Sequence, residues 1–218
     1  MTTTIAGVTL ATPDPDGAAA FYGGLLGWRR DGAVLLEGHT PVAALTTGAG
    51  PLPGWGVTLA GTAERAVSAG GRVVGGPAVV VHDPVGAAFA TAAPGVALPA
   101  PGPGRPVWFE NMTTDADAAD AFYAAVAGWT VQPAGPGYAL FVEDGRPVAG
   151  RLVLPPDLVA ALGPRWMVYL SHADVDAGVE VVVALGGAVP VPPRDTPTGR
   201  LAAVVDPGGA VFTLLTPA

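Results

Sequence analysis

The residues best suited to chemistry lie in a strand-like run at 107–112, where Trp108, Glu110 and Met112 alternate with other side chains. Successive side chains of a strand point to opposite faces, so these three share one face. A carboxylate beside an indole and a thioether loses hydration, and its pKa is expected to rise. Such a carboxyl group suits general acid or base catalysis near neutral pH. The alternative is that Glu110 lies at a strand end and pairs with an arginine.

Further candidates are scattered along the chain. Tyr138 begins a strand-like run after a Gly-Pro-Gly turn, and Tyr169 lies in another run. Either hydroxyl could donate a hydrogen bond to a carbonyl group, and each residue could equally be a half-buried strand aromatic. His39 lies in a turn and could reach the mouth of a cavity. His39, His82 and His172 show no i, i+4 or H-x-E spacing, which favours structural roles over a metal site.

Composition and charge exclude several classes of function. The 218 residues include 18 acidic and 10 basic side chains, the latter all arginine, and the formal net charge is -8. This balance argues against binding to nucleic acid or to an anionic membrane. Without cysteine or lysine the chain has no disulfide, thiolate metal site or Walker-type phosphate loop. No signal peptide is visible and prolines interrupt the longest uncharged stretch, so we expect a cytoplasmic protein.

The chain contains an internal repeat. Three landmarks recur 101 positions apart, namely Asp14/Asp115, Phe21/Phe122 and Trp28/Trp129. Further pairs follow in the same order at growing separation, namely Glu37/Glu143, Pro41/Pro147, Trp55/Trp166 and Asp83/Asp206. Duplication followed by insertions in loops produces such a steadily growing offset. We predict a first module at 1–93, a Pro/Gly-rich linker at 94–106 and a second module at 107–218.

Each module is expected to run strand, helix, strands, helix, strands, which is an α+β pattern. Asp14 and Asp115 stand at the N-cap positions of the first helices, and Gly27 and Gly128 stand at their C-terminal ends. Between these limits the apolar residues follow i, i+3, i+4, i+7 spacing, which is typical of one buried helix face.

These patterns resemble the vicinal oxygen chelate superfamily, which includes glyoxalases, extradiol dioxygenases and bleomycin-resistance proteins. The resemblance covers nearly the whole chain and rests on Asp14…Phe21-Tyr22…Leu26-Gly27-Trp28, Asp115…Phe122-Tyr123…Gly128-Trp129, Asp174-Val175-Asp176 and the run Asp206–Phe212. Residues 108–115 are similar to the W-x-E-L-x-T-x-D motif of a two-module actinobacterial type. The fold implied is two tandem βαβββ modules, each a curved mixed sheet cupping a cavity with helices outside.

The resemblance also implies where a metal would bind. Active members of the superfamily usually hold one divalent ion through three strand positions. In this chain those positions are occupied by Gly7, Gly56 and Ala90 in the first module and by Trp108, Met167 and Thr213 in the second. Glycine and alanine have no donor atom, and the other three form no set that suits such an ion. We therefore expect no metal and no other cofactor.

If those positions face the cup, strand alternation makes the first module's wall small and the second module's wall bulky and aromatic. A wide apolar cup of this kind suits a planar hydrophobic ligand. The expected ligand contacts are Trp108, Met112, Met167, Tyr169, Thr213, Trp55 and Trp166. For Trp55 and Trp166, which match each other between the modules, the alternative is core or rim packing.

The function expected from these residues is metal-independent acid–base catalysis by Glu110, with Tyr138 and His39 assisting. The reaction would be dehydration, cyclisation or isomerisation of a bulky, oxygenated hydrophobic molecule, such as an aromatic polyketide intermediate. One alternative is a non-catalytic protein that binds or sequesters a drug or antibiotic, and another is a metal-dependent dioxygenase or glyoxalase-like enzyme. The one binding partner expected is the hydrophobic small molecule. The protein is expected to be a monomer or a homodimer, and either of the two cups could be the active one.

Overall fold

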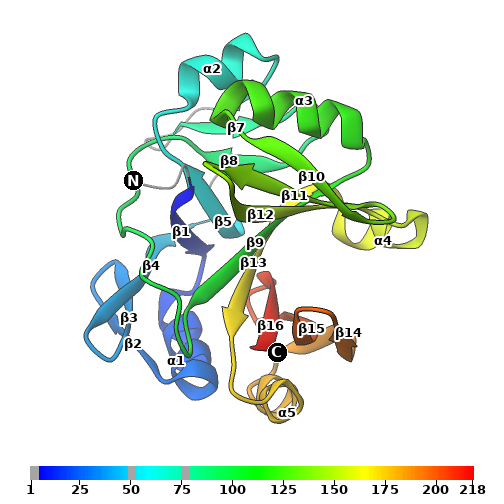
Figure 1. Cartoon of the computed structure of the whole chain (residues 1–218). Helices are drawn as coiled ribbons and strands as arrows, with labels where there is room; N and C mark the ends of the chain where they lie inside the picture. The colour runs from blue at the N-terminus through cyan, green and yellow to red at the C-terminus, as the bar shows by residue number, and fades with distance from the viewer. Residues whose placement is uncertain (1–4, 49–52, 75–78) are drawn as a thin grey trace. The chain divides into compact units, whose positions relative to one another are not determined.

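The structure is a computed structural model that describes residues 5–48, 53–74 and 79–218 (Figure 1). The first module contains β1 (Ile5–Thr12), α1 (Pro15–Leu26), β2 (Trp28–Asp31), β3 (Val34–Glu37), β4 (Thr40–Thr47), β5 (Gly54–Leu59), α2 (Ala63–Ser68), β6 (Arg72–Val74), β7 (Val80–His82) and β8 (Ala88–Ala90). The second contains β9 (Pro106–Thr113), α3 (Ala116–Ala127), β10 (Thr130–Gly135), β11 (Tyr138–Glu143), β12 (Arg146–Val153), α4 (Pro156–Leu162), β13 (Arg165–Ser171), α5 (Val175–Ala184), β14 (Ala188–Thr196), β15 (Gly199–Val205) and β16 (Val211–Pro217).

The strands form two mixed sheets of eight, in the orders β2-β3-β4-β1-β5-β8-β7-β6 and β10-β11-β12-β9-β13-β16-β15-β14. This confirms the predicted α+β fold of two tandem modules. Within each module the order strand, helix, three strands occurs twice, as in β1-α1-β2-β3-β4 and β9-α3-β10-β11-β12. The first strand of such a motif pairs in parallel with the last, β1 with β4 and β9 with β12. Each module is therefore itself built from two copies of a smaller motif.

Two compact units divide the chain differently from its sequence repeat. Unit 1 comprises the described residues within 1–6, 56–94 and 108–167, and unit 2 comprises those within 7–55, 95–107 and 168–218. Each unit combines half of one module with half of the other. Helices α2 and α3 pack together in unit 1, where Figure 1 shows them side by side, and α1 packs with α5 in unit 2. The module boundaries at 1–93, 94–106 and 107–218 describe the sequence repeat and not the compact units, and they stay a prediction.

The first helix of each module begins and ends where its sequence predicts. The Asp14 carboxylate accepts the backbone N–H of Gly17 (2.9 Å), and Asp115 caps α3 in the same way. Such a cap satisfies one of the backbone donors that a helix start leaves without a partner. Gly27 and Gly128 close the two helices in the left-handed region, at φ 71° and 74°. A side chain would be strained at that φ, which accounts for glycine at both ends.

A buried hydrogen-bonded triad joins helix to turn in the core of unit 2. The indole N–H of Trp55 donates to the hydroxyl of Tyr22 (2.7 Å), which donates in turn to the carboxylate of Asp206 (3.0 Å). The other carboxylate oxygen of Asp206 accepts the backbone N–H of Ala210 (2.8 Å). The Asp-Pro-Gly motif at 206–208 therefore holds its own turn and anchors α1.

Unit 1 contains the matching triad with one additional member. Trp166 donates to the hydroxyl of Tyr123 (2.9 Å), and Tyr123 donates to Asp83 (2.9 Å). Asn111 adds a further N–H bond to the same hydroxyl (3.2 Å), while its own buried carbonyl oxygen has no partner among the described residues. Stacking of Tyr123 on Trp129, with ring centroids 5.9 Å apart, completes the cluster. Both triads thus serve packing and stability.

Candidate functional site

The two faces of β9 have different roles. Asn111 points toward α3, where it bonds Tyr123, and α3 covers that side of the β9–β12 strands (Figure 1). Trp108, Glu110 and Met112 alternate with Asn111 and so lie on the opposite face. Glu110 is 5% exposed and Met112 7% exposed, while Trp108 is half-buried. The structure therefore places a buried carboxylate between an indole and a thioether.

The register of β9, β12 and β11 extends this face across three strands. Glu110 pairs with Gly150 on β12, and Met112 pairs with Leu152. On the next strand, Tyr138 pairs with Leu152. Paired residues project to the same side of a sheet, so Tyr138 lies on the face of Glu110, two strands away.

Tyr138 spans that distance, because its hydroxyl oxygen lies over Gly150, the residue that pairs with Glu110 across the strands. Trp108 and Glu110 both lie close enough to this phenol to influence its pKa. Burial, followed by the negative charge of Glu110, raises the pKa of Tyr138 from 10.0 to about 12. Tyr138 therefore keeps its proton at neutral pH and acts as a donor.

We call Trp108, Glu110 and Tyr138 the Trp-Tyr-Glu cluster. It combines a proton acceptor with an adjacent proton donor on a largely apolar wall, an arrangement that can move a proton to or from a bound molecule. Sequence patterning identified all three residues but gave no sign that they contact one another. The raised pKa predicted for Glu110 stays a prediction.

The first module does not repeat this cluster. The register of β1 and β4 pairs Thr9 with Ala44, as that of β9 and β12 pairs Glu110 with Gly150. Thr9 therefore corresponds to Glu110, and Gly32, by the offset of the repeat, corresponds to Tyr138. With neither carboxylate nor phenol at these positions, the first module lacks the proton-handling groups that the second presents.

Other expected ligand contacts lie on β13 and β16. Tyr169 pairs with Thr213, and the two are 7% and 3% exposed, both in unit 2. Leu214, next in the chain, projects the other way toward Gly178 of α5. Met167 is fully buried and belongs to unit 1. Their roles as ligand contacts stay predictions.

For Trp55 and Trp166 a packing role accounts for the whole side chain. They are 6% and 3% exposed, and both indole N–H groups bond the buried tyrosines of the triads. This is the alternative that the sequence left open. His39 lies exposed in the turn between β3 and β4, in unit 2, whereas the Trp-Tyr-Glu cluster lies in unit 1.

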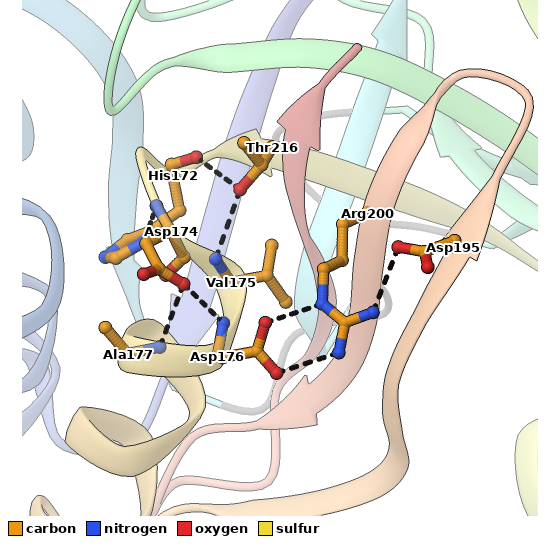
Figure 2. A network of polar contacts seen from close by, with 8 residues as sticks. All are labelled: His172, Asp174, Val175, Asp176, Ala177, Asp195, Arg200 and Thr216. Atoms are coloured by element: carbon orange, nitrogen blue, oxygen red, sulfur yellow. Dashed lines mark hydrogen bonds and ion pairs between the residues drawn. The ribbon is translucent and has the colours of Figure 1, made fainter.

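The polar residues around α5 form a surface network (Figure 2). Arg200 binds Asp176 through two hydrogen bonds (2.5 and 2.8 Å) and Asp195 through a third (3.0 Å). The bonds from Arg200 hold the pKa of Asp176 below its ordinary 3.8. The ring of His172 contacts the backbone of Asp174 at the start of the helix. A structural partner is thus present for each of these side chains, namely Arg200, Asp176, Asp195 and His172. This agrees with the structural role expected for His172.

A divalent metal does not fit the residues that this fold offers it. Of the positions corresponding to metal ligands, Thr213 is the single side chain with an oxygen donor, and it is buried beside Tyr169. Among the described residues, no group of three or more His, Asp or Glu side chains is placed to share an ion. Divalent ions in proteins need several carboxylate, imidazole or thiolate ligands. We therefore derive no step through a metal.

Comparisons with known proteins agree with the repeated fold. A sequence profile of the glyoxalase-like domain matches residues 107–215. The putative glyoxylase CFP32 of Mycobacterium tuberculosis is 37% identical over 117 residues, which are 51% of this chain but only 45% of that protein. The anthracycline biosynthesis protein DnrV of Streptomyces peucetius is 31% identical over an alignment 252 positions long, which covers 94% of this chain and 90% of DnrV. DauV of Streptomyces sp. is 32% identical over the same extent.

Solved structures show the same fold at low sequence identity. The Mn(II)-bound glyoxalase from Novosphingobium aromaticivorans aligns with a TM-score of 0.62 at 17% identity, covering 98% of this chain and 82% of that one. The 2,3-dioxygenase LapB from Pseudomonas sp. KL28 aligns with a TM-score of 0.62 at 12% identity, covering 100% and 94%. The profile match and the Streptomyces relatives, together with this shared fold, place the chain in the vicinal oxygen chelate superfamily. Within it, the chain belongs to the glyoxalase-like family, and it contains two sheet modules.

None of the helices within the described residues is long and apolar enough to cross a membrane.

Proposed function

We propose that this protein is a metal-independent enzyme that performs acid–base chemistry on a bulky, oxygenated hydrophobic molecule. The observation that carries the proposal is the buried Glu110 with the Tyr138 phenol beside it. Glu110 takes a proton from a carbon or hydroxyl next to a substrate carbonyl and returns it elsewhere on the same molecule. The Tyr138 hydroxyl stabilises the carboxylate form of Glu110 before the first transfer and after the second.

The relatives support the class of substrate. DnrV and DauV are named as anthracycline biosynthesis proteins, and the matches cover nearly all of this chain. Anthracyclines are aromatic polyketides, flat and rich in phenol, quinone and ketone groups. The half-buried Trp108, with Met112 and Leu152 beside it, offers a flat apolar wall for such rings. Dehydration, cyclisation and isomerisation of such molecules all proceed by proton transfer.

The experiment is turnover of aromatic polyketide intermediates by the wild-type protein and by Glu110→Gln. Glutamine keeps the shape and an acceptor oxygen for Tyr138 but does not take up a proton at neutral pH. We expect kcat to fall about 100-fold or more, the usual contribution of a general base. Glu143→Gln is the matched control, because Glu143 is a glutamate of β11, two strands from β9, and its carboxylate accepts the indole N–H of Trp129. Turnover that survives Glu110→Gln with the fold intact would remove Glu110 from the mechanism.

The second candidate function is binding without turnover, which the close packing of Tyr138 beside Glu110 would also suit. Here the cluster would fix the wall of a binding cup. Incubation with the same intermediates and mass spectrometry separates the two functions. A binder returns each ligand unchanged at one equivalent, whereas an enzyme returns a product of equal mass or of mass lowered by one water.

A further inference from the structure

Tyr138 reaches Glu110 by crossing the intervening strand β12 at Gly150. A Cβ atom built on Gly150 would lie 2.3 Å from the Tyr138 hydroxyl oxygen, 2.9 Å from Cζ and 3.1 Å from Cε2. Real Cβ atoms essentially never approach other atoms closer than 3.0 Å. The phenol ring therefore lies over the bare backbone of Gly150 and occupies the space of a side chain.

Backbone conformation gives no reason for glycine at this position. Gly150 lies inside β12, is buried and is not among the glycines with positive φ. Glycine in a strand interior weakens the strand, and it often marks a place where another group approaches closely. Here the approaching group is the phenol of Tyr138.

The first module provides an internal comparison. Its residue corresponding to Gly150 is Ala44, which pairs with Thr9, and its residue corresponding to Tyr138 is Gly32. The first module thus has alanine in place of the strand glycine and glycine in place of the tyrosine. Where no phenol crosses the strand, the Cβ is present; where the phenol crosses, it is absent.

We propose that Gly150 is a positioning residue of the acid–base site, because its missing side chain lets the Tyr138 hydroxyl lie over β12, next to Glu110 and Trp108. The catalytic part of this proposal rests on the proposed function, but the effect of residue 150 on the position of Tyr138 can be tested separately. A methyl group at residue 150 moves the half-buried phenol outward, away from Glu110 and Trp108. Glu110 itself is left in place and unmodified.

The test is Gly150→Ala in the full-length protein, followed through the indole N–H resonances of uniformly ¹⁵N-labelled protein. The chain has five tryptophans, and Trp108→Phe assigns the resonance of Trp108. We expect Gly150→Ala to shift the Trp108 resonance to its position in Tyr138→Phe and to leave the other four indoles unchanged. Gly95→Ala is the control, since its Cβ would meet Ala44 at an ordinary 3.5 Å.

A double variant keeps the test decisive if Gly150→Ala does not fold. Gly150→Ala with Tyr138→Gly reproduces the combination of the first module and removes the steric conflict. Recovery of folding in the double variant supports the positioning role. A second supporting result is that Gly150→Ala shifts the Trp108 resonance when Tyr138 is present and does not shift it when Tyr138 is replaced. An unchanged Trp108 resonance in folded Gly150→Ala overturns it, as does failure of the double variant to fold. Turnover by Glu110→Gln is a separate measurement, so either idea can fail without the other.

Discussion

Removal of one hydroxyl group from each buried triad should destabilise the two units unequally. Tyr22→Phe leaves two buried groups without their partner, the carboxylate of Asp206 and the indole N–H of Trp55. Each such group costs about 1–3 kcal/mol, so we expect a loss of about 3 kcal/mol in the free energy of unfolding. Tyr123→Phe leaves three, because Asn111 also bonds that hydroxyl, and should cost about 1 kcal/mol more.

The pH dependence of Tyr22→Phe follows from the charge of Asp206. Burial raises the pKa of this carboxyl above 3.8, and the hydrogen bond from Tyr22 opposes the rise. Without Tyr22's hydroxyl the folded-state pKa of Asp206 rises further. A raised folded-state pKa gives stability that is complete below the unfolded pKa and is lost as pH increases through the folded value. The cost of Tyr22→Phe should therefore be larger at pH 7 than at pH 4.

The assay is urea unfolding followed by far-ultraviolet circular dichroism at both pH values, with hydrogen exchange of the Trp55 and Trp166 indole protons to assign each loss to its unit. Wild-type protein measured under the same conditions is the reference. Losses below about 1 kcal/mol for both variants, or a larger loss for Tyr22→Phe than for Tyr123→Phe, would refute the assignment of partners given above.

Two further predictions concern polar groups outside the Trp-Tyr-Glu cluster. Asn111→Leu introduces the residue that the first module has at the corresponding position, Leu10. It also removes a buried carbonyl oxygen that lacks a partner among the described residues. We expect the free energy of unfolding to increase by about 1 kcal/mol, and a decrease in the same urea assay would contradict this. Arg200→Gln should return the pKa of the Asp176 carboxyl toward 3.8, because the arginine bonds that lower it are gone. In the wild-type protein, the stability contributed by the Arg200–Asp176 contact is present above pH 3.8 and is lost as the pH falls through the lower folded-state pKa of Asp176. Carbon NMR titration of Asp176 in both proteins measures the shift of this pKa.

The sequence predicted the fold well because its signals are local or repeated. Capping by Asp14, the left-handed Gly27 and the apolar face of α1 each depend on residues within a few positions of one another. The repeat then indicated that the same elements occur twice. What it did not show is that each module contains the strand-helix-three-strand motif twice, or that each compact unit takes half of either module.

Trp55 and Trp166 show where local patterning stops. Their matched places indicated a common role, and the choice between ligand contact and core packing depended on partners far along the chain. Tyr22 and Asp206 are 184 positions apart, and no periodicity connects them. Burial of Trp55 against that pair is a consequence of how the helices pack against the sheets.

For the candidate site, the sequence by itself determined that Trp108, Glu110 and Met112 share one face of a strand, because alternation is a property of the extended backbone. Only the tertiary structure decided that Tyr138 meets them, because strand register fixes which residues stand opposite one another across a sheet. The place of Gly150 beneath the phenol follows from that register as well, since a glycine in the sequence does not reveal which side chain fills its space.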